Sequence, residues 1–320
     1  MRYILFILIA CLVTVPALAG STISAAPPYH SIAEKFPAFF DQTSGMSTPA
    51  RVAAFKERFA SLFPGFYEPA EGQTQNQFDK SVADAFTSFP ALRSRYEKVE
   101  QEFPQDYSIG IAHFRKQFPG FKPVLPIWFV HSLGRMDGGT RTFDGKTYMI
   151  FGADVIARVH SDGSIGPFLD HELYHVENGQ WFKDCRPDTT IWCSLWQEGT
   201  AVYAASVMNP GANDHMLMLD SPKPIRQDVD KKWHDAICQV LMDFDKNDES
   251  TYESYFYIGG SLQQFPHRWG YYFGYRIIQR IARHYTLLQI DHFDDATAHR
   301  LMTQELNVMA KEVGGCSRRV

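Results

Sequence analysis

The chain has 320 residues, of which 45% are hydrophobic, and a formal net charge of −5 at pH 7. A chain of this length can bury a large core and permits one or two domains. The mildly acidic balance, without a basic stripe, argues against a nucleic-acid-binding protein.

The first nineteen residues have the pattern of a secretory signal peptide. Arg2 supplies the positive charge, residues 4–15 form an apolar core, and Ala17-Leu18-Ala19 is a small-residue cleavage site. We therefore expect cleavage after Ala19 and a periplasmic or secreted protein. The apolar core is too short to span a hydrocarbon layer of ~30 Å, so no integral membrane segment is expected after cleavage. A lipoprotein anchored at Cys11 is the less favoured alternative.

The N-terminal part of the mature chain is expected to be helical. Residues 20–45 are interpreted as a flexible leader followed by a first helix. Thr48-Pro49 then begins a helix, because Val52, Phe55 and Phe59 follow at helical spacing.

Phenylalanine followed by proline recurs at irregular spacing along the chain. Because proline disfavours the α region for the preceding residue, we interpret these pairs as helix ends, each with an aromatic ring packed inward. A short linear recognition motif is the weaker alternative. The pairs are Phe36-Pro37, Phe63-Pro64, Phe89-Pro90, Phe103-Pro104, Phe118-Pro119 and Phe265-Pro266.

A small β region is predicted before the central helices. Residues 124–130 and 147–151 are strand candidates, separated by Gly138-Gly139-Thr140 and by the turn signal Asp144-Gly145. The strand at 147–151 is either an edge strand that holds an extended peptide through its backbone or an internal strand, and the sequence leaves both open.

The segment His171-Glu172-Leu173-Tyr174-His175 is the H-E-x-x-H pattern of a zinc hydrolase. On a helix that has Pro167 in its first turn and ends near Asn178-Gly179, both histidines project from one face and can bind one Zn²⁺. Glu172 would lie beside the metal and act as general base, taking a proton from the attacking water. The alternative is a buried helix whose histidines are satisfied by other protein groups.

Catalytic zinc needs a third protein ligand, and Glu198 is the candidate. We place it at the start of a second helix whose small residues allow close packing on the first. The alternative is a solvated carboxylate that faces a helix dipole. The small residues are Gly199, Thr200, Ala201, Ala204 and Ala205.

These motifs resemble those of gluzincin-type zinc peptidases, which carry H-E-x-x-H on one helix and a glutamate on a following helix. With Gly138-Gly139-Thr140 and with Gly270-Tyr271-Tyr272-Phe273-Gly274-Tyr275, they look like an uncharacterised family of predicted zinc-dependent proteases. The resemblance implies a mainly helical α+β fold of zincin-like type, with a small β-sheet ahead of the zinc helix and one Zn²⁺.

One position departs from the thermolysin kind of gluzincin, in which an acidic residue four positions after the glutamate ligand orients a zinc histidine. That position is Val202 here. Asp170, Asp184 or a backbone carbonyl would have to take the role, and the sequence does not decide among them.

Cysteine usage agrees with export. Removal of the signal peptide leaves Cys185, Cys193, Cys238 and Cys316, an even number that suits an oxidising compartment. Of the three possible pairings, Cys185 with Cys193 would tie the two zinc helices together, and Cys238 with Cys316 would then anchor the C-terminal tail. The alternative is four buried thiols.

A last helix is expected over residues 267–285, with Phe273, Ile277 and Ile281 on its apolar face. Tyr271 lies on the flank of that face and is our candidate hydrogen-bond donor to the oxyanion of a tetrahedral intermediate. A packing role is the alternative for this tyrosine. The other candidate donors are His267, Arg268 and Arg276.

We interpret residues 46–320 as a single gluzincin-like catalytic unit, with N-terminal helices and sheet in 46–160 and zinc helices and a C-terminal helical lobe in 161–320. The expected function is a secreted or periplasmic zinc metallopeptidase that acts on a peptide or protein substrate. A non-catalytic periplasmic zinc- or peptide-binding protein is the alternative, but such a site needs no carboxylate at Glu172. The sequence does not distinguish endopeptidase, aminopeptidase and cell-wall amidase, and it does not give the oligomeric state.

Overall fold

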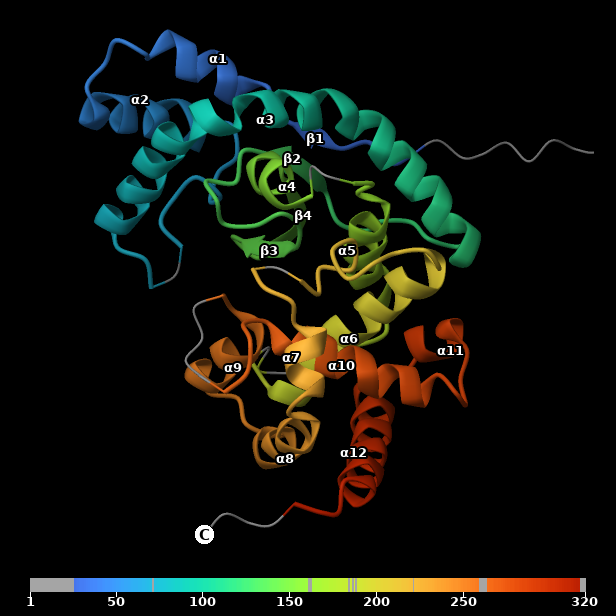
Figure 1. Cartoon of the computed structure of the whole chain (residues 1–320). Helices are drawn as coiled ribbons and strands as arrows, with labels where there is room; N and C mark the ends of the chain where they lie inside the picture. The colour runs from blue at the N-terminus through green and yellow to red at the C-terminus, as the bar shows by residue number, and fades with distance from the viewer. Residues whose placement is uncertain are drawn as a thin grey trace, which may run out of the picture.

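The computed structural model describes residues 26–70, 72–160, 163–183, 185, 187, 189–220, 222–258 and 264–316. The expected signal peptide and Asp184 lie outside these residues. Across the described residues the fold is α+β and mainly helical, with a four-stranded sheet, as predicted (Figure 1). No helix within them has the length and apolar character needed to cross a membrane.

Three helices form the N-terminal part: α1 (Lys35–Gln42), α2 (Thr48–Ala60) and α3 (Gln75–Gln117). The predicted start of α2 is confirmed. The prediction that each Phe-Pro pair ends a helix is wrong for Pro37, which lies in the first turn of α1, and for Pro90 and Pro104, which lie inside α3. Phe89 and Phe103 are fully buried there; burying a side chain of this size gains about 1.5–3 kcal/mol, which offsets the roughly 3 kcal/mol cost of an internal proline.

The sheet contains β1 (His30–Ser31), β2 (Ile127–Val130), β3 (Thr140–Phe143) and β4 (Lys146–Gly152), in the order β1-β2-β4-β3. The first three strands in this order run parallel, and β3 is antiparallel to β4. The predicted strand at 147–151 is therefore internal. The edges of the sheet are β1 and β3, and β3 lies in the connection between the two strands predicted from the sequence.

The hairpin between β3 and β4 turns at Asp144 and Gly145. Both have positive φ, 49° and 73°, as a two-residue turn with the right twist for a hairpin requires. This turn fixes the register in which Thr140 faces Met149, so the first residue of the edge strand lies directly after the Gly138-Gly139 pair.

After β4 the chain forms α4 (Ala153–Val159), α5 (Gly166–Asn178) and α6 (Ile191–Met208). The predicted bounds of α5 are confirmed. Glu198 lies in the middle of α6 and not at its start, so that placement is wrong. Thr190 is the N-cap of α6, and the first turns of this helix bury Ile191, Leu195 and Trp196. This apolar stretch extends the helix on the N-terminal side of Glu198.

In its described residues the C-terminal part consists of helices joined by turns and irregular segments. Its last long helices, α10 and α12, pack against α6 and against each other. The apolar face predicted for residues 267–285 is buried in α10 as expected. The helices are α7 (Arg226–Asp230), α8 (Trp233–Asp243), α9 (Glu249–Phe256), α10 (Trp269–Ile281), α11 (Leu287–Asp291) and α12 (Asp295–Glu312).

Two disulfides are present, and both follow the expected pairing. Cys185–Cys193 closes the connection between α5 and α6, and Cys238–Cys316 joins α8 to the segment after α12. Both bonds lie in the C-terminal half of the chain, the first across a sequence separation of 8 and the second across 78.

The core consists of two clusters of buried apolar side chains, one around α1–α5 and the sheet and the other among the C-terminal helices. Helix α6 belongs to both, since Ala201 faces the first cluster and Trp196 the second. It also crosses α10 closely: a Cβ on Gly199 would lie 2.4 Å from the carbonyl carbon of Gly274. The helix that carries Glu198 is therefore held from two sides.

Candidate metal centre

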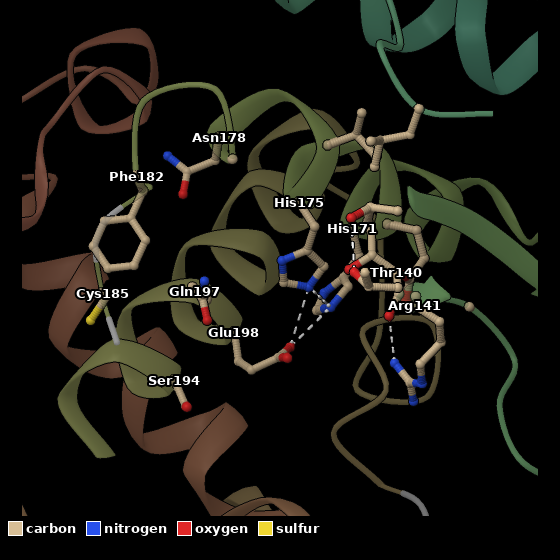
Figure 2. Close-up of a pocket in the computed structure, with 18 of the residues that line it drawn as sticks. Thr140, Arg141, His171, His175, Asn178, Phe182, Cys185, Ser194, Gln197 and Glu198 are labelled. Atoms are coloured by element: carbon tan, nitrogen blue, oxygen red, sulfur yellow. Dashed lines mark hydrogen bonds and ion pairs between the residues drawn. The ribbon is translucent and has the colours of Figure 1, made fainter. Parts of the chain in front are cut away.

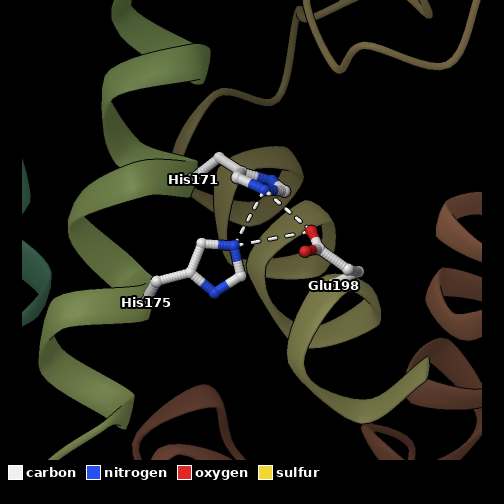
Figure 3. Close-up of side chains that lie close together, drawn as sticks. All are labelled: His171, His175 and Glu198. Atoms are coloured by element: carbon white, nitrogen blue, oxygen red, sulfur yellow. Dashed lines mark hydrogen bonds and ion pairs between the residues drawn. The ribbon is translucent and has the colours of Figure 1, made fainter. Parts of the chain in front are cut away.

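Helices α5 and α6 bring His171, His175 and Glu198 together at the boundary of the two clusters (Figure 3). The Nε2 atoms of the two histidines are 3.1 Å apart. Glu198 Oε2 lies 3.2 Å from His171 Nε2 and 3.5 Å from His175 Nε2. Three ligand atoms from two helices thus surround one point.

These separations fit a zinc ion. Ligand atoms ~2.0–2.1 Å from a tetrahedral metal lie about 3.3 Å from one another, and the three measured distances are close to this value. A donor set of two histidines and one carboxylate also leaves a fourth position open, as catalytic zinc requires. Within the described residues no other group of three His, Cys, Asp or Glu side chains is placed to hold an ion.

The charges of the three ligands are coupled. Burial alone would raise the pKa of Glu198, but the two histidines hold it well below its ordinary range. Burial lowers the pKa of His171, whereas the carboxylates of Glu198 and Glu172 raise that of His175 against the same effect. The carboxylate ligand is therefore ionised and ready for a cation.

Glu172 follows His171 on α5 and is 6% exposed. Burial, with the negative charges of Asp137 and Glu198, raises the pKa of Glu172 to about 8, although His175 opposes the shift. A carboxyl group in such surroundings has a proton affinity close to that needed for proton transfer near neutral pH.

The Gly138-Gly139 turn lies directly against Glu172. A Cβ on Gly138 would be 2.6 Å from Glu172 Cδ, and Gly139 has a φ of 136°, which favours glycine. The turn is held by the Gly152 amide, which donates to the Asp137 carbonyl at 2.8 Å. The sequence motif is thus explained by a close approach of the backbone to this carboxyl group.

Of the groups considered from the sequence as partners of the candidate ligand histidines, Asp170 forms its hydrogen bonds elsewhere. The Asp170 carboxylate accepts hydrogen bonds from His113 Nδ1 at 2.9 Å and from Asn209 Nδ2 at 2.7 Å. It therefore binds these two residues and not a candidate ligand histidine. In the part of the chain that the structure describes, His171 Nδ1 is buried without a hydrogen-bond partner. Asp184 lies outside that part.

A cavity of about 820 Å³ opens over the three ligands. Tyr271 lines it, with its ring 6.3 Å from the ring of His171 between centroids. Arg268 also lines it, and its Cζ lies 4.3 Å from the centre of the Tyr271 ring. The other two candidate donors, His267 and Arg276, are not among the lining residues.

Figure 2 shows two sides of this cavity that the motifs did not reveal. Arg141, on the edge strand β3, lies on one side of the ligands, and Phe182 and Cys185 lie on the other. Arg141 was missed because nothing in its local sequence marks it as part of a site; only the neighbouring Gly138-Gly139 pair signals an unusual backbone.

One comparison with known proteins gives a match. A family model described as predicted Zn-dependent protease (DUF2268) matches residues 117–301, more than half of the chain. No curated protein and no solved structure matches. The matched segment includes the edge strand, both ligand helices and α10.

Proposed function

The chain belongs to this family of predicted zinc-dependent proteases, and from that membership and the geometry of the site we propose that it is a secreted or periplasmic zinc metallopeptidase. His171, His175 and Glu198 hold one Zn²⁺. The observation that carries the proposal is the meeting of three ligand atoms at distances of 3.1–3.5 Å, next to a buried carboxyl group that is not a ligand.

The fold proposed for residues 46–320 is a single zincin-like catalytic unit. The sheet and the Gly138-Gly139 turn supply part of the cavity lining, and α5, α6 and later segments supply the rest. The two disulfides support export, since such bonds persist in oxidising compartments.

The bound metal supplies a Lewis acid that lowers the pKa of water from 15.7 to about 7. Glu172 accepts a proton from the attacking water and passes it to the leaving amine. Tyr271 donates a hydrogen bond to the oxyanion of the tetrahedral intermediate. Burial, reinforced by the charge of Glu198, raises the pKa of Tyr271 well above its ordinary value, so the hydroxyl keeps its proton.

An extended peptide fits the edge strand. β3 pairs with β4 on one side only, and its Thr140, Arg141 and Thr142 line the cavity. An edge strand offers free backbone groups to an added strand. This supports a peptide substrate held through its main chain across the metal site.

The test combines metal analysis with cleavage of a broad peptide library by the mature protein. Wild type should contain one zinc per chain and cleave; His175→Ala should lose the metal. Glu172→Gln should keep the metal and lose roughly 10²–10⁴-fold in turnover, because the amide cannot accept the proton. Glu177→Gln, the same change on the same helix, is the matched control and should cleave normally.

Full zinc occupancy in His175→Ala would contradict the ligand set. Equal turnover by Glu172→Gln and wild type would contradict the role of Glu172. A zinc-loaded wild type that cleaves nothing in the library would favour a zinc- or peptide-binding protein.

A further inference from the structure

Three cationic side chains line the cavity over the ligands: Arg141, Lys183 and Arg268. Within the described residues none of them forms an ion pair with a carboxylate. Some arginines elsewhere do form such pairs, as Arg93 does with Asp41 at 2.7 Å and Arg226 with Asp214. The cationic groups of the cavity thus lack a carboxylate within ion-pair distance.

The acidic groups of the cavity are already engaged. Asp137 lies 2.9 Å from His160 Nε2 and accepts from the Gly138 amide at 3.0 Å. Glu198 lies between the two histidines, and Glu172 is buried against Gly138. None of them is left to serve as the partner of an arginine.

Arg268 is held in the cavity by an unusual backbone. It is the N-cap of α10 and has φ 61° and ψ 21°, the left-handed region, which is unfavourable for a residue with a side chain. Its guanidinium lies over the Tyr271 ring, an arrangement that favours a cation. A strained residue that places a half-buried, unpaired charge in a cavity is typical of a binding role.

Arg141 lines the same cavity from the edge strand β3. Its Nη1 donates to the Thr140 carbonyl at 2.7 Å, which keeps the guanidinium beside the edge strand. A Cβ on Gly139 would lie 3.6 Å from this Nη1 atom, so the guanidinium is next to the Gly138-Gly139 turn that contacts Glu172.

We propose that Arg141 and Arg268 form a subsite for a substrate carboxylate close to the scissile bond. A guanidinium binds a carboxylate with two parallel hydrogen bonds, and a peptide offers this group in two ways, as its C-terminus or as an aspartate or glutamate side chain. This inference rests on the proposed function, because it names the substrate class for the same site.

The test uses zinc-loaded mature Glu172→Gln protein, in which binding is separated from cleavage. The probes are acetylated tetra-alanine with a free C-terminus, its C-terminal amide, and amides in which glutamate replaces each alanine in turn. Calorimetry should show at least one carboxylate-bearing peptide binding about 10- to 100-fold tighter than the neutral amide, as expected for a charge-assisted hydrogen bond. The tightest probe identifies the carboxylate source.

Arg268→Gln and Arg141→Gln, added to this protein, should each remove most of that preference, and Arg268→Lys should keep part of it. Arg58→Gln, an exposed arginine on α2, is the control and should keep all of it. Equal affinity for all peptides in the parent protein would overturn the subsite, whether or not the arginine variants fold. Selective binding without cleavage by wild type would reject the proposed function and leave the subsite standing; cleavage without any carboxylate preference would do the reverse.

Discussion

Glu172 and Glu198 carry the same carboxyl group, yet their surroundings shift its pKa in opposite directions. Glu198 lies between two imidazoles, which hold its pKa far below the ordinary range. Glu172 is buried against a glycine turn, and its pKa rises to about 8. Neighbouring groups whose surroundings push their pKa values apart are typical of divided roles: an ionised ligand in one case and a proton acceptor and donor in the other.

Gly138→Ala tests how finely Glu172 must be placed. The added Cβ would lie 2.6 Å from Glu172 Cδ, so the carboxyl group has to move while the three ligands stay. We expect unchanged zinc content and a kcat about 10²-fold lower, the effect of a displacement of roughly 1 Å at a reacting group. Gly120→Ala is the control, because a Cβ there meets nothing within 4 Å. Normal kcat in Gly138→Ala would contradict the role given to this turn.

Tyr271→Phe tests the oxyanion donor. If the hydroxyl stabilises charge that arises only in the transition state, kcat and kcat/KM should both fall by roughly 10²–10³-fold while KM and zinc content stay near normal. Tyr275→Phe is the control: that ring is 7% exposed and does not line the cavity. A variant of Tyr271 with normal kcat and only a lower melting temperature would show a packing role.

At the scale of the elements, helices with clear local signals were predictable. The turn with Pro167 and the glycine after Asn178 bound α5 correctly, since these signals act within a few residues. Pro90 and Pro104 gave a wrong prediction of helix ends. The cost of an internal proline is local, whereas the burial of the preceding phenylalanine rings depends on the whole first cluster. The strand β3 was missed for a similar reason: three of its four residues are exposed, and only its pairing with β4 makes it a strand.

The candidate site was predictable in its residues but not in its shape. The H-E-x-x-H spacing alone puts two histidines on one face of a helix. The distance from these to Glu198 depends on the contact of Gly199 with Gly274, which joins segments far apart in the sequence. Arg268 enters the cavity through a left-handed backbone, and no local pattern indicates that.

Helix α11 ends in Asp291, which is 0% exposed, and no described group donates a hydrogen bond to its carboxylate oxygens. Burial, with the charge of Glu177, raises its pKa from 3.8 to about 7. The folded state therefore holds a proton that the unfolded state releases. This contribution to stability is complete below about pH 4 and is lost as the pH rises through 7.

As the pH rises, we expect the metal-free Asp291→Asn variant to become more stable relative to metal-free wild type. Between pH 5.5 and 8.5 the difference in the free energy of unfolding should widen by about 2 kcal/mol in favour of the variant. Urea unfolding at the two pH values measures it. Asp245→Asn, whose side chain is 75% exposed, should show no widening, and a constant difference for Asp291→Asn would contradict the raised pKa.

At the scale of the whole molecule, the candidate metal centre lies where the two apolar clusters meet, with two residues on α5 and one on α6, the helix that belongs to both clusters. The disulfides relate to this boundary differently. Cys185–Cys193 spans 8 residues of the connection between the ligand helices, and Cys238–Cys316 spans 78 residues within the C-terminal lobe. Loop-closure entropy gives about 2.5 kcal/mol for the first bond and about 4.5 kcal/mol for the second.

Removal of the two disulfides should therefore have different effects on stability and on zinc affinity. Replacing Cys238 and Cys316 by alanine should lower the free energy of unfolding of the metal-free protein more than replacing Cys185 and Cys193 does. It should leave zinc affinity near normal. Replacing Cys185 and Cys193 should cost less stability but weaken zinc binding, because the segment between His175 and Glu198 then samples more conformations before the ligands meet. Urea unfolding and competition with a chelator measure the two quantities. Equal zinc affinity in both double variants would show that packing of α6 between α5 and α10 alone sets the ligand geometry.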